Sequence, residues 1–308
     1  MNLQHVQNNS KNPAQSRQEL RALLQEGLQV KESKMNLAGI ETAILLGGSG
    51  NPLILMHGPG ESAEWWMRVI PHLTEMYQVI VPDLPGHGAS AVDMNKLNTE
   101  GMVNWLDELI DKTCGSAPVL FGHILGVAIA ARYVLKNEDK IKQLVLVDSF
   151  GLSKFRPAPS FAFGMLKFLV HPTPNTFDSF MTHCLYNPSG FQSEMAEKWL
   201  PFKRYNLSWI NKPGSSKVMN TMMKKLAMPV IPGEKLAAIK IPVALIWGRH
   251  DKALKLHIAE TASKKYGWPL HIIDDSRDDP KIERPEAFVD ALNKAINSQE
   301  SKTQRNVI

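Results

Sequence analysis

The sequence predicts an α/β protein: a mostly parallel, doubly wound sheet with an inserted helical cap. Six short apolar runs alternate with amphipathic helical patterns along most of the chain. Runs of this kind are typical of parallel strands that are buried on both faces by helices. The alternation stops between residues 152 and 235, where no convincing strand run occurs. A chain of 308 residues is long enough for one large domain with an insertion.

The strands and the helices between them are distinguished by the spacing of their apolar residues. The runs that predict strands lie at residues 53–56, 78–81, 118–121, 144–147, 242–247 and 270–273. Two segments have an apolar helical face, made of Met102, Trp105, Leu106, Leu109 and Ile110 in one and of Phe288, Val289, Leu292 and Ile296 in the other. We expect these faces to pack on the sheet.

The segment 152–235 predicts the helical cap. It is rich in Met, Phe, Trp and Pro, and apolar residues such as Met165, Phe168 and Leu169 recur at helical spacing. Adaptable Met and aromatic side chains suit a packed helical subdomain, and they equally suit a lid over an apolar ligand. Both interpretations are compatible with one structure.

The chain before the core predicts a polar leader, residues 1–34, with one amphipathic helix. We expect disorder over residues 1–15. Ser16 and Glu19 then form a capping box, Leu20, Leu23 and Leu24 share a helical face, and Gly27 ends the helix. This face packs either on the domain itself or on a partner, so a homo-oligomer or a protein partner through this helix stays open. The core is assigned to residues 35–151 and 236–298, and a polar tail to 299–308.

Composition excludes several classes of function. The net charge of +5 is scattered without a basic run, which argues against nucleic-acid binding. No apolar stretch reaches the roughly 18 residues of a membrane span, so we expect no membrane insertion. Cys114 and Cys184 lie far apart without metal-ligand spacing, and the amino terminus lacks the apolar core of a signal peptide. These features predict a cytoplasmic protein with reduced thiols, no metal and no cofactor.

One short motif raises the question of function. The run at 118–121 leads into Gly122-His123-Ile124-Leu125-Gly126, and a helical pattern of small residues follows at once. This is the form of a strand, a sharp turn and a helix, with Ile124 at the tip. In G-x-S-x-G hydrolases the tip residue is the nucleophilic serine. Isoleucine cannot attack a substrate.

Several motifs in a fixed order carry a family resemblance. They are "LMHGPGES", "VPDLPGHGAS", "GHILG", "LVLVDSFGL", "IWGRHD" and "DDSRDDPKIERPEAF". From about Met35 to Asn297 the chain resembles the capped branch of the α/β-hydrolase fold, which includes epoxide hydrolases, haloalkane dehalogenases and carbon–carbon bond hydrolases. The resemblance implies an α/β-hydrolase fold with a helical cap and a triad of nucleophile, acid and histidine.

Carried over by position, the triad is degenerate. The resemblance places Ile124 at the nucleophile, Asp251 at the acid and Asp278 at the histidine. Without a nucleophilic atom at 124 or an imidazole at 278, the family's covalent chemistry has no reagents. Leu125 supplies one backbone donor of the implied oxyanion hole, but Pro59, at the other position, has no N–H.

The remaining candidates surround the expected pocket. In the implied fold, we expect Asp251 and Asp278 to approach each other. Two close carboxylates raise the pKa of one of them, which can create an acid–base pair. The alternative is that Arg277, or water at an open rim, neutralises Asp278. Recruitment of His123 as a base is a further possibility. The residues expected to contact a ligand are Gly58, Pro59, His123, Ile124 and Leu125.

Three hypotheses follow from these residues. The first is a non-hydrolytic protein that binds a small hydrophobic molecule. The second is a lyase, cyclase or isomerase that uses Asp251 and Asp278 for proton transfer, since an oriented ligand in an apolar pocket can react without a nucleophile. The third is a hydrolase with an unconventional site.

Overall fold

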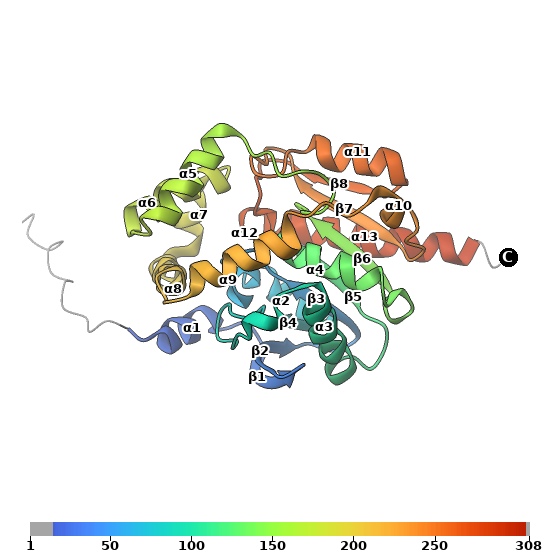
Figure 1. Cartoon of the computed structure of the whole chain (residues 1–308), viewed down its shortest axis with the longest axis horizontal. Coiled ribbons are helices and arrows are strands. Elements are labelled where there is room, and N and C mark those ends of the chain that lie inside the picture. Colours follow the sequence, from blue (N-terminus) through green and yellow to red (C-terminus); the bar gives the residue numbers. More distant parts are fainter. Residues whose placement is uncertain (1–14, 306–308) are drawn as a thin grey trace, which may run out of the picture.

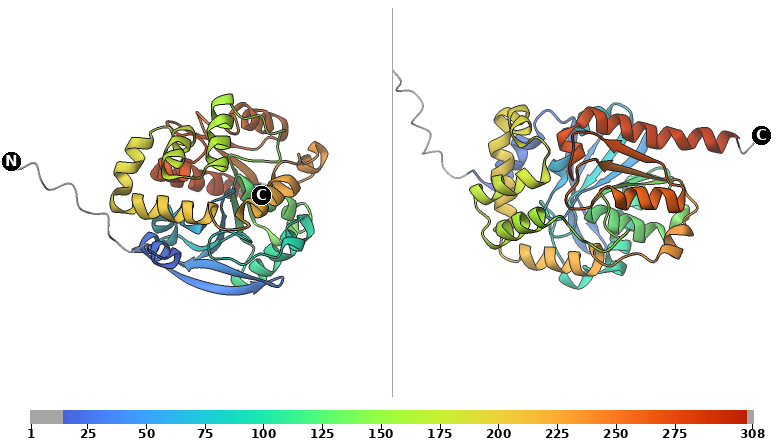
Figure 2. Two further views of the ribbon diagram at one scale, coloured as in Figure 1. Left: turned by 60° about the vertical axis from the view of Figure 1, so that its left-hand side comes forward. Right: turned by 90° about the horizontal axis from the view of Figure 1, so that it is seen from above.

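The computed structural model describes residues 15–305, with side chains placed up to residue 297. One eight-stranded sheet runs through the molecule, and a group of helices covers one end of it (Figure 1). Helices α4 (Leu125–Val134) and α13 (Pro285–Arg305) lie on opposite sides of this sheet (Figure 2). The predicted α/β architecture is therefore confirmed. The expected disorder falls almost wholly on residues outside the described range.

The sheet has the order β1-β2-β4-β3-β5-β6-β7-β8. The strands are β1 (Val30–Leu37), β2 (Ile40–Gly47), β3 (Asn51–Met56), β4 (Tyr77–Pro82), β5 (Val119–His123), β6 (Gln143–Val147), β7 (Val243–Gly248) and β8 (Leu270–Ile273). The pairs from β4 through β8 are parallel, while β1–β2 and β2–β4 are antiparallel. All six predicted strands are present.

Sequence reasoning missed the amino-terminal hairpin of β1 and β2. Its turn contains Ala38 and Gly39, both at positive φ (47° and 76°), which matches a tight two-residue hairpin. Strand β1 lies at the edge of the sheet, and most of its side chains are partly or fully exposed. Because an edge strand needs few buried residues, its sequence lacks the apolar run that identifies a central strand.

Two predicted boundaries are wrong at the ends of the core. The sheet begins at Val30, inside the segment 1–34 that was assigned to the leader. Helix α13 continues to Arg305, through most of the predicted tail at 299–308. No glycine or proline interrupts the sequence between Pro285 and Arg305, so no residue there ends the helix.

Helices of the core cover the sheet. They are α2 (Ile70–Thr74), α3 (Thr99–Thr113), α4, α10 (Gly233–Ala237), α11 (His257–Tyr266), α12 (Pro280–Glu283) and α13. The short turns are η1 (Ala63–Trp66), η2 (Met94–Lys96) and η3 (Glu138–Lys140). The apolar residues predicted for the two amphipathic segments are buried in α3 and α13.

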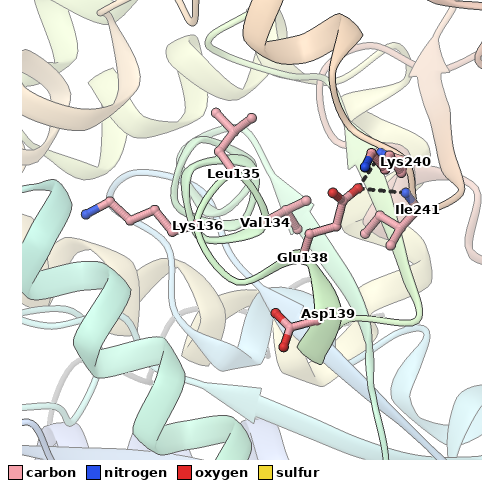
Figure 3. Close-up of a pocket in the computed structure, with 7 residues that line it drawn as sticks. All are labelled: Val134, Leu135, Lys136, Glu138, Asp139, Lys240 and Ile241. Atoms are coloured by element: carbon pink, nitrogen blue, oxygen red, sulfur yellow. Dashed lines mark hydrogen bonds between the residues drawn. The ribbon is translucent and has the colours of Figure 1, made fainter.

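The cap consists of helices, as predicted. They are α5 (Pro159–Val170), α6 (Pro174–Cys184), α7 (Pro188–Met195), η4 (Ala196–Lys198), α8 (Trp199–Ile210), α9 (Ser215–Met222) and the π-helical turn η5 (Met223–Ala227). These helices lie beyond one end of the sheet (Figure 1). The return from the cap to β7 is held by Glu138, whose carboxylate accepts the backbone N–H groups of Lys240 and Ile241 beside a shallow surface hollow (Figure 3).

The leader helix α1 (Arg17–Gln25) packs against cap helix α8 of the same chain (Figure 1). The Ser16–Glu19 capping box is confirmed, with both reciprocal hydrogen bonds present. Leu20 and Leu24 are buried, but Leu23 is 36% exposed, so the apolar face is narrower than predicted. The helix therefore buries its apolar face on its own domain.

A buried arginine explains why the leader helix is held in place. Arg21 is 5% exposed, and its guanidinium lies 2.6 Å from Glu32 Oε2, 2.9 Å from Glu64 Oε2 and 2.9 Å from Asp83 Oδ2. It also donates to the Tyr205 hydroxyl at 2.9 Å. One cation thus joins the leader, the edge of the sheet, two core loops and the cap.

We expect Arg21→Met to lower the free energy of unfolding by about 3–5 kcal/mol, because it leaves buried carboxylates without a counter-charge. The matched control is Arg17→Met. Arg17 lies on the same helix, is only partly buried and donates to Ser208 and Gly88. Its loss should cost about 1 kcal/mol. Urea unfolding of both variants measures the difference.

Equal effects of the two substitutions would contradict this account of Arg21.

Deletion through Gly27 tests the packing of α1 independently. The shortened protein should be less stable and keep its association state in light scattering. A changed association state at unaltered stability would place α1 at an interface between subunits.

Candidate functional site

The turn after β5 keeps the geometry of a nucleophile elbow. Ile124 has φ 48° and ψ −95°, a conformation that strains a β-branched residue. A Cβ on Gly122 would lie 2.4 Å from Val127 N, and one on Gly126 would lie 2.3 Å from Met56 O. Both positions therefore require glycine. The Ile124 N–H donates to Val147 O at 3.2 Å, which ties the turn to β6.

A cavity of about 300 Å³ lies between this elbow and the cap. Its walls are mostly aromatic and Met side chains, among them Phe150, Phe161, Phe168, Phe180, Met181 and Met219. The cap segments predicted from Met165, Phe168 and Leu169 contribute directly to it. The cap is thus both a packed helical subdomain and the cover of an apolar cavity.

The structure divides the predicted site residues into two groups. Pro59, Ile124 and Asp278 line the cavity. Four others are not among its lining residues: Gly58, His123, Leu125 and Asp251. Leu125 begins helix α4, and the Gly58 N–H donates to Glu61 Oε2 at 2.9 Å. These residues shape the wall from behind.

Sequence reasoning missed a buried lysine behind the cavity. Lys281 is fully buried, and its Nζ donates to Asp279 and to His123 Nδ1, the latter at 2.8 Å. Glu61 Oε2 lies 3.5 Å away. Burial alone would lower the pKa of Lys281, but the carboxylates of Asp279 and Glu61 outweigh it and raise that pKa. The ammonium stays charged.

Glu61 and His123 complete this cluster. Burial would raise the pKa of Glu61, but the nearby Lys281 ammonium outweighs this effect and lowers that pKa far below its ordinary value. His123 Nδ1 accepts from Lys281, so its Nε2–H donates to the Asp278 carbonyl oxygen at 2.6 Å. Both ring nitrogens are therefore engaged in the protein interior. A signal for this cluster existed in the sequence, since Glu61, Asp279 and Lys281 all stand within the family motifs.

Three side chains of this cluster are of the types that bind metal ions. One ligand atom each from Glu61, His123 and Asp279 lies within 4.8 Å of the others. The Lys281 ammonium bonds to His123 and Asp279 directly and supplies the positive charge that a metal would bring. We assign this cluster to the lysine.

Two further carboxyl groups are buried with unusual pKa values. Asp251 Oδ1 accepts from Ala253 N at 2.6 Å and Leu254 N at 2.8 Å, and burial raises the pKa of Asp251 to about 7. Burial, followed by the charges of Asp279 and Asp251, raises the pKa of Asp278 well above its ordinary value. Burial and the neighbouring acids therefore favour the protonated form of the Asp278 carboxyl in the wall of the cavity.

The expected neutralisation of Asp278 by Arg277 or by water at an open rim is wrong. Asp278 is only 4% exposed. The Arg277 guanidinium donates instead to the carbonyl oxygen of Thr182 in the cap. Burial disfavours the charged carboxyl and raises its pKa well above its ordinary value, so its surroundings favour the protonated form over an ion pair.

Comparison with known families identifies the fold. The profile described as "alpha/beta hydrolase fold" matches residues 51–285, from β3 to the start of α13. This chain belongs to the α/β-hydrolase-fold family. Among the described residues, no helix of this family member is long and apolar enough to cross a membrane.

The family's relatives cover most of the chain. An uncharacterised protein of Mycobacterium tuberculosis is 25% identical over 280 residues, which are 85% of this chain and 80% of that protein. The 2-hydroxy-6-oxo-6-(2'-aminophenyl)hexa-2,4-dienoic acid hydrolase of Metapseudomonas resinovorans is 27% identical over 261 residues, 80% of this chain and 81% of its own.

A solved structure agrees with the fold. The 2-hydroxy-6-oxo-6-phenylhexa-2,4-dienoate hydrolase of Rhodococcus sp. strain RHA1 superposes with a TM-score of 0.75 at 21% identity, covering 87% of this chain and 99% of that one. At this identity the likeness concerns the fold alone.

The buried carboxyl of Asp251 makes stability depend on pH. An unfolded Asp loses its proton near pH 4, whereas folded Asp251 keeps it to about pH 7. Since the folded state binds more protons in this range, Asp251 costs stability as pH rises from 4 to 7. Relative to Asp251→Asn, the unmodified protein should lose on the order of 3 kcal/mol across that range.

Urea unfolding at several pH values measures this difference. Asp290→Asn is the control, because Asp290 is exposed on α13. Its unfolding curve should follow that of the unmodified protein at every pH. If Asp251→Asn does so as well, Asp251 is not held protonated in the folded state.

Proposed function

We propose that this α/β-hydrolase-fold protein binds a small hydrophobic molecule in the cavity under the cap and does not hydrolyse it. Ile124 carries the proposal. It stands at the tip of an elbow that has kept its strained backbone, and its side chain lines the cavity. A branched hydrocarbon at this position adds apolar wall and supplies no nucleophile.

Two further features support a lost hydrolytic site. Asp278 stands where the family resemblance implies the histidine, and its surroundings favour the protonated carboxyl, a form that cannot act as the base that activates water. Pro59, which lines the cavity, has no N–H for an oxyanion. The loss of a hydrolytic site is therefore supported at three separate positions, two in the triad and one in the oxyanion hole. The proposal includes a cytoplasmic location, in keeping with two free cysteines.

A lyase, cyclase or isomerase is the second candidate, and Asp278 favours it. A protonated acid in an apolar cavity can donate a proton to a ligand, as buried carboxylic acids do in other enzymes. Asp251 lies behind it as a second titrating carboxyl. Deuterium that enters a bound ligand from D₂O, seen by NMR and lost in Asp278→Asn, would favour this candidate over simple binding.

The proposal predicts no ester hydrolysis by the unmodified protein. With a panel of nitrophenyl esters, turnover should not exceed that of Ile124→Ala. The double variant Ile124→Ser with Asp278→His should gain weak activity, while neither single change suffices, because triad members act as a unit. Turnover by the unmodified protein that Asp278→Asn removes would instead support a hydrolase with an unconventional site.

Hydrophobic molecules should raise the melting temperature, since binding to the folded state alone stabilises it. A screen of lipophilic lactones, terpenoids and aromatic amines tests this. Ile124→Phe should narrow the cavity and reduce the shift. The control is Leu200→Phe, which adds the same volume at a residue that is 48% exposed and does not line the cavity. Shifts that are unchanged in Ile124→Phe would place the ligand elsewhere.

A further inference from the structure

The walls of the cavity are mostly apolar, and the ionisable groups of Asp and Glu that line it are all acids. Three carboxyl groups line it, those of Glu61, Asp278 and Asp279. None of the described residues that line it is Lys, Arg or His. The positive charge of Lys281 lies behind the wall and is already shared between Glu61 and Asp279. A ligand therefore meets acids and no free base.

One of the three acids has unused hydrogen-bonding capacity. Glu61 accepts from Gly58 N and contacts Lys281, and Asp279 accepts from Lys281. Asp278 is 4% exposed, and its Oδ1 has no hydrogen-bond partner among the described residues. A buried polar atom without a partner costs free energy, which a ligand can recover by bonding to it.

The walls suit the rest of such a ligand. Trp65, Phe150, Phe161 and Phe180 are among the aromatic residues that line the cavity. Aromatic faces attract an ammonium as well as hydrocarbon. No described residue of the lining places a cation beside an anionic ligand, and Glu61 repels one.

We infer that the natural ligand is a lipophilic amine whose ammonium bonds to Asp278 and whose hydrocarbon part fills the aromatic cavity. This inference rests on the proposed binding function and deepens it by naming the ligand class. An amine ligand would differ in charge from the dienoic acid and the dienoate in the names of two similar hydrolases. A carboxylate in this cavity would have no cation to pair with.

The proposal predicts that amine binding releases a proton. The cavity wall favours the protonated form of Asp278 before binding, and an ammonium beside it favours the ionised carboxylate, so binding shifts the Asp278 proton to solvent. In the free protein the carboxyl groups of Asp279, Asp251 and Glu283 oppose ionisation of Asp278, and that of Asp148 adds to them. Cys184 also interacts with Asp278, but its thiol is neutral because burial raises its pKa. A neutral ligand of the same shape should release none.

A matched series tests the ligand class on the full chain. The probes are 4-phenylbutylamine, 4-phenylbutanol and 4-phenylbutyrate, which share one hydrocarbon and differ in charge. By titration calorimetry at pH 7.5, the amine should bind at least about tenfold more tightly than the alcohol, as a charge-assisted bond allows, and the acid should bind most weakly. Repeating the titration in buffers of different ionisation enthalpy measures the released proton.

Asp278→Asn is the matched variant, because an amide mimics the protonated acid in size. It should lower amine affinity by about tenfold or more while alcohol affinity changes less than twofold. Binding of the alcohol with no preference for the amine would overturn the amine inference and leave the binding function standing. Tightest binding of the acid would also overturn it. Failure of all three probes and of the lipophilic screen would overturn the proposed function itself.

Discussion

The floor of the cavity depends on the buried ammonium of Lys281. Glu61 and Asp279 could not be buried as charged groups without a cation beside them, because an unpaired ion in a protein interior costs several kcal/mol. Lys281 supplies that cation from α12, next to the position where the family's histidine is expected. It also fixes the His123 ring through Nδ1. One side chain thus joins the loop after β3, the end of β5 and the segment after β8.

The elbow keeps its backbone geometry although the residue at its tip is not a nucleophile. The close approaches of Gly122 and Gly126 to backbone atoms hold the turn whatever residue occupies its tip. Ile124 accepts a strained φ because the surrounding strands and helix determine the backbone there. In hydrolases this strained turn presents a nucleophile, whereas here it presents the hydrocarbon side chain of Ile124 to the cavity. The backbone of the elbow therefore keeps its shape with a hydrocarbon side chain at its tip.

A second buried cation holds the two halves of the molecule together. Arg21 on α1 bonds to Tyr205 on cap helix α8 and to Glu64 and Asp83 in core loops. The cap is consequently tied to the core on the side of the leader as well as through the chain connections at β6 and β7. Both buried cations occupy places where acidic residues from distant segments converge, and each satisfies carboxylates that hydrophobic packing alone could not bury.

Local pattern determined the central strands, the inserted helices, the capping box at Ser16 and the elbow around Ile124. Each of these is encoded by neighbouring residues, whose apolar spacing or turn chemistry is visible in the sequence. The edge strand β1, the partners of Arg21 and the Lys281 cluster were decided only by tertiary structure. Edge strands need little apolar surface, so no apolar run marks them in the sequence. A buried charge can be identified only from its partners, which lie up to some 220 residues away along the chain (Glu61 to Lys281). The same holds for Asp278. Its position followed from motif order, but its protonation depends on burial among other acids, which no local pattern expresses.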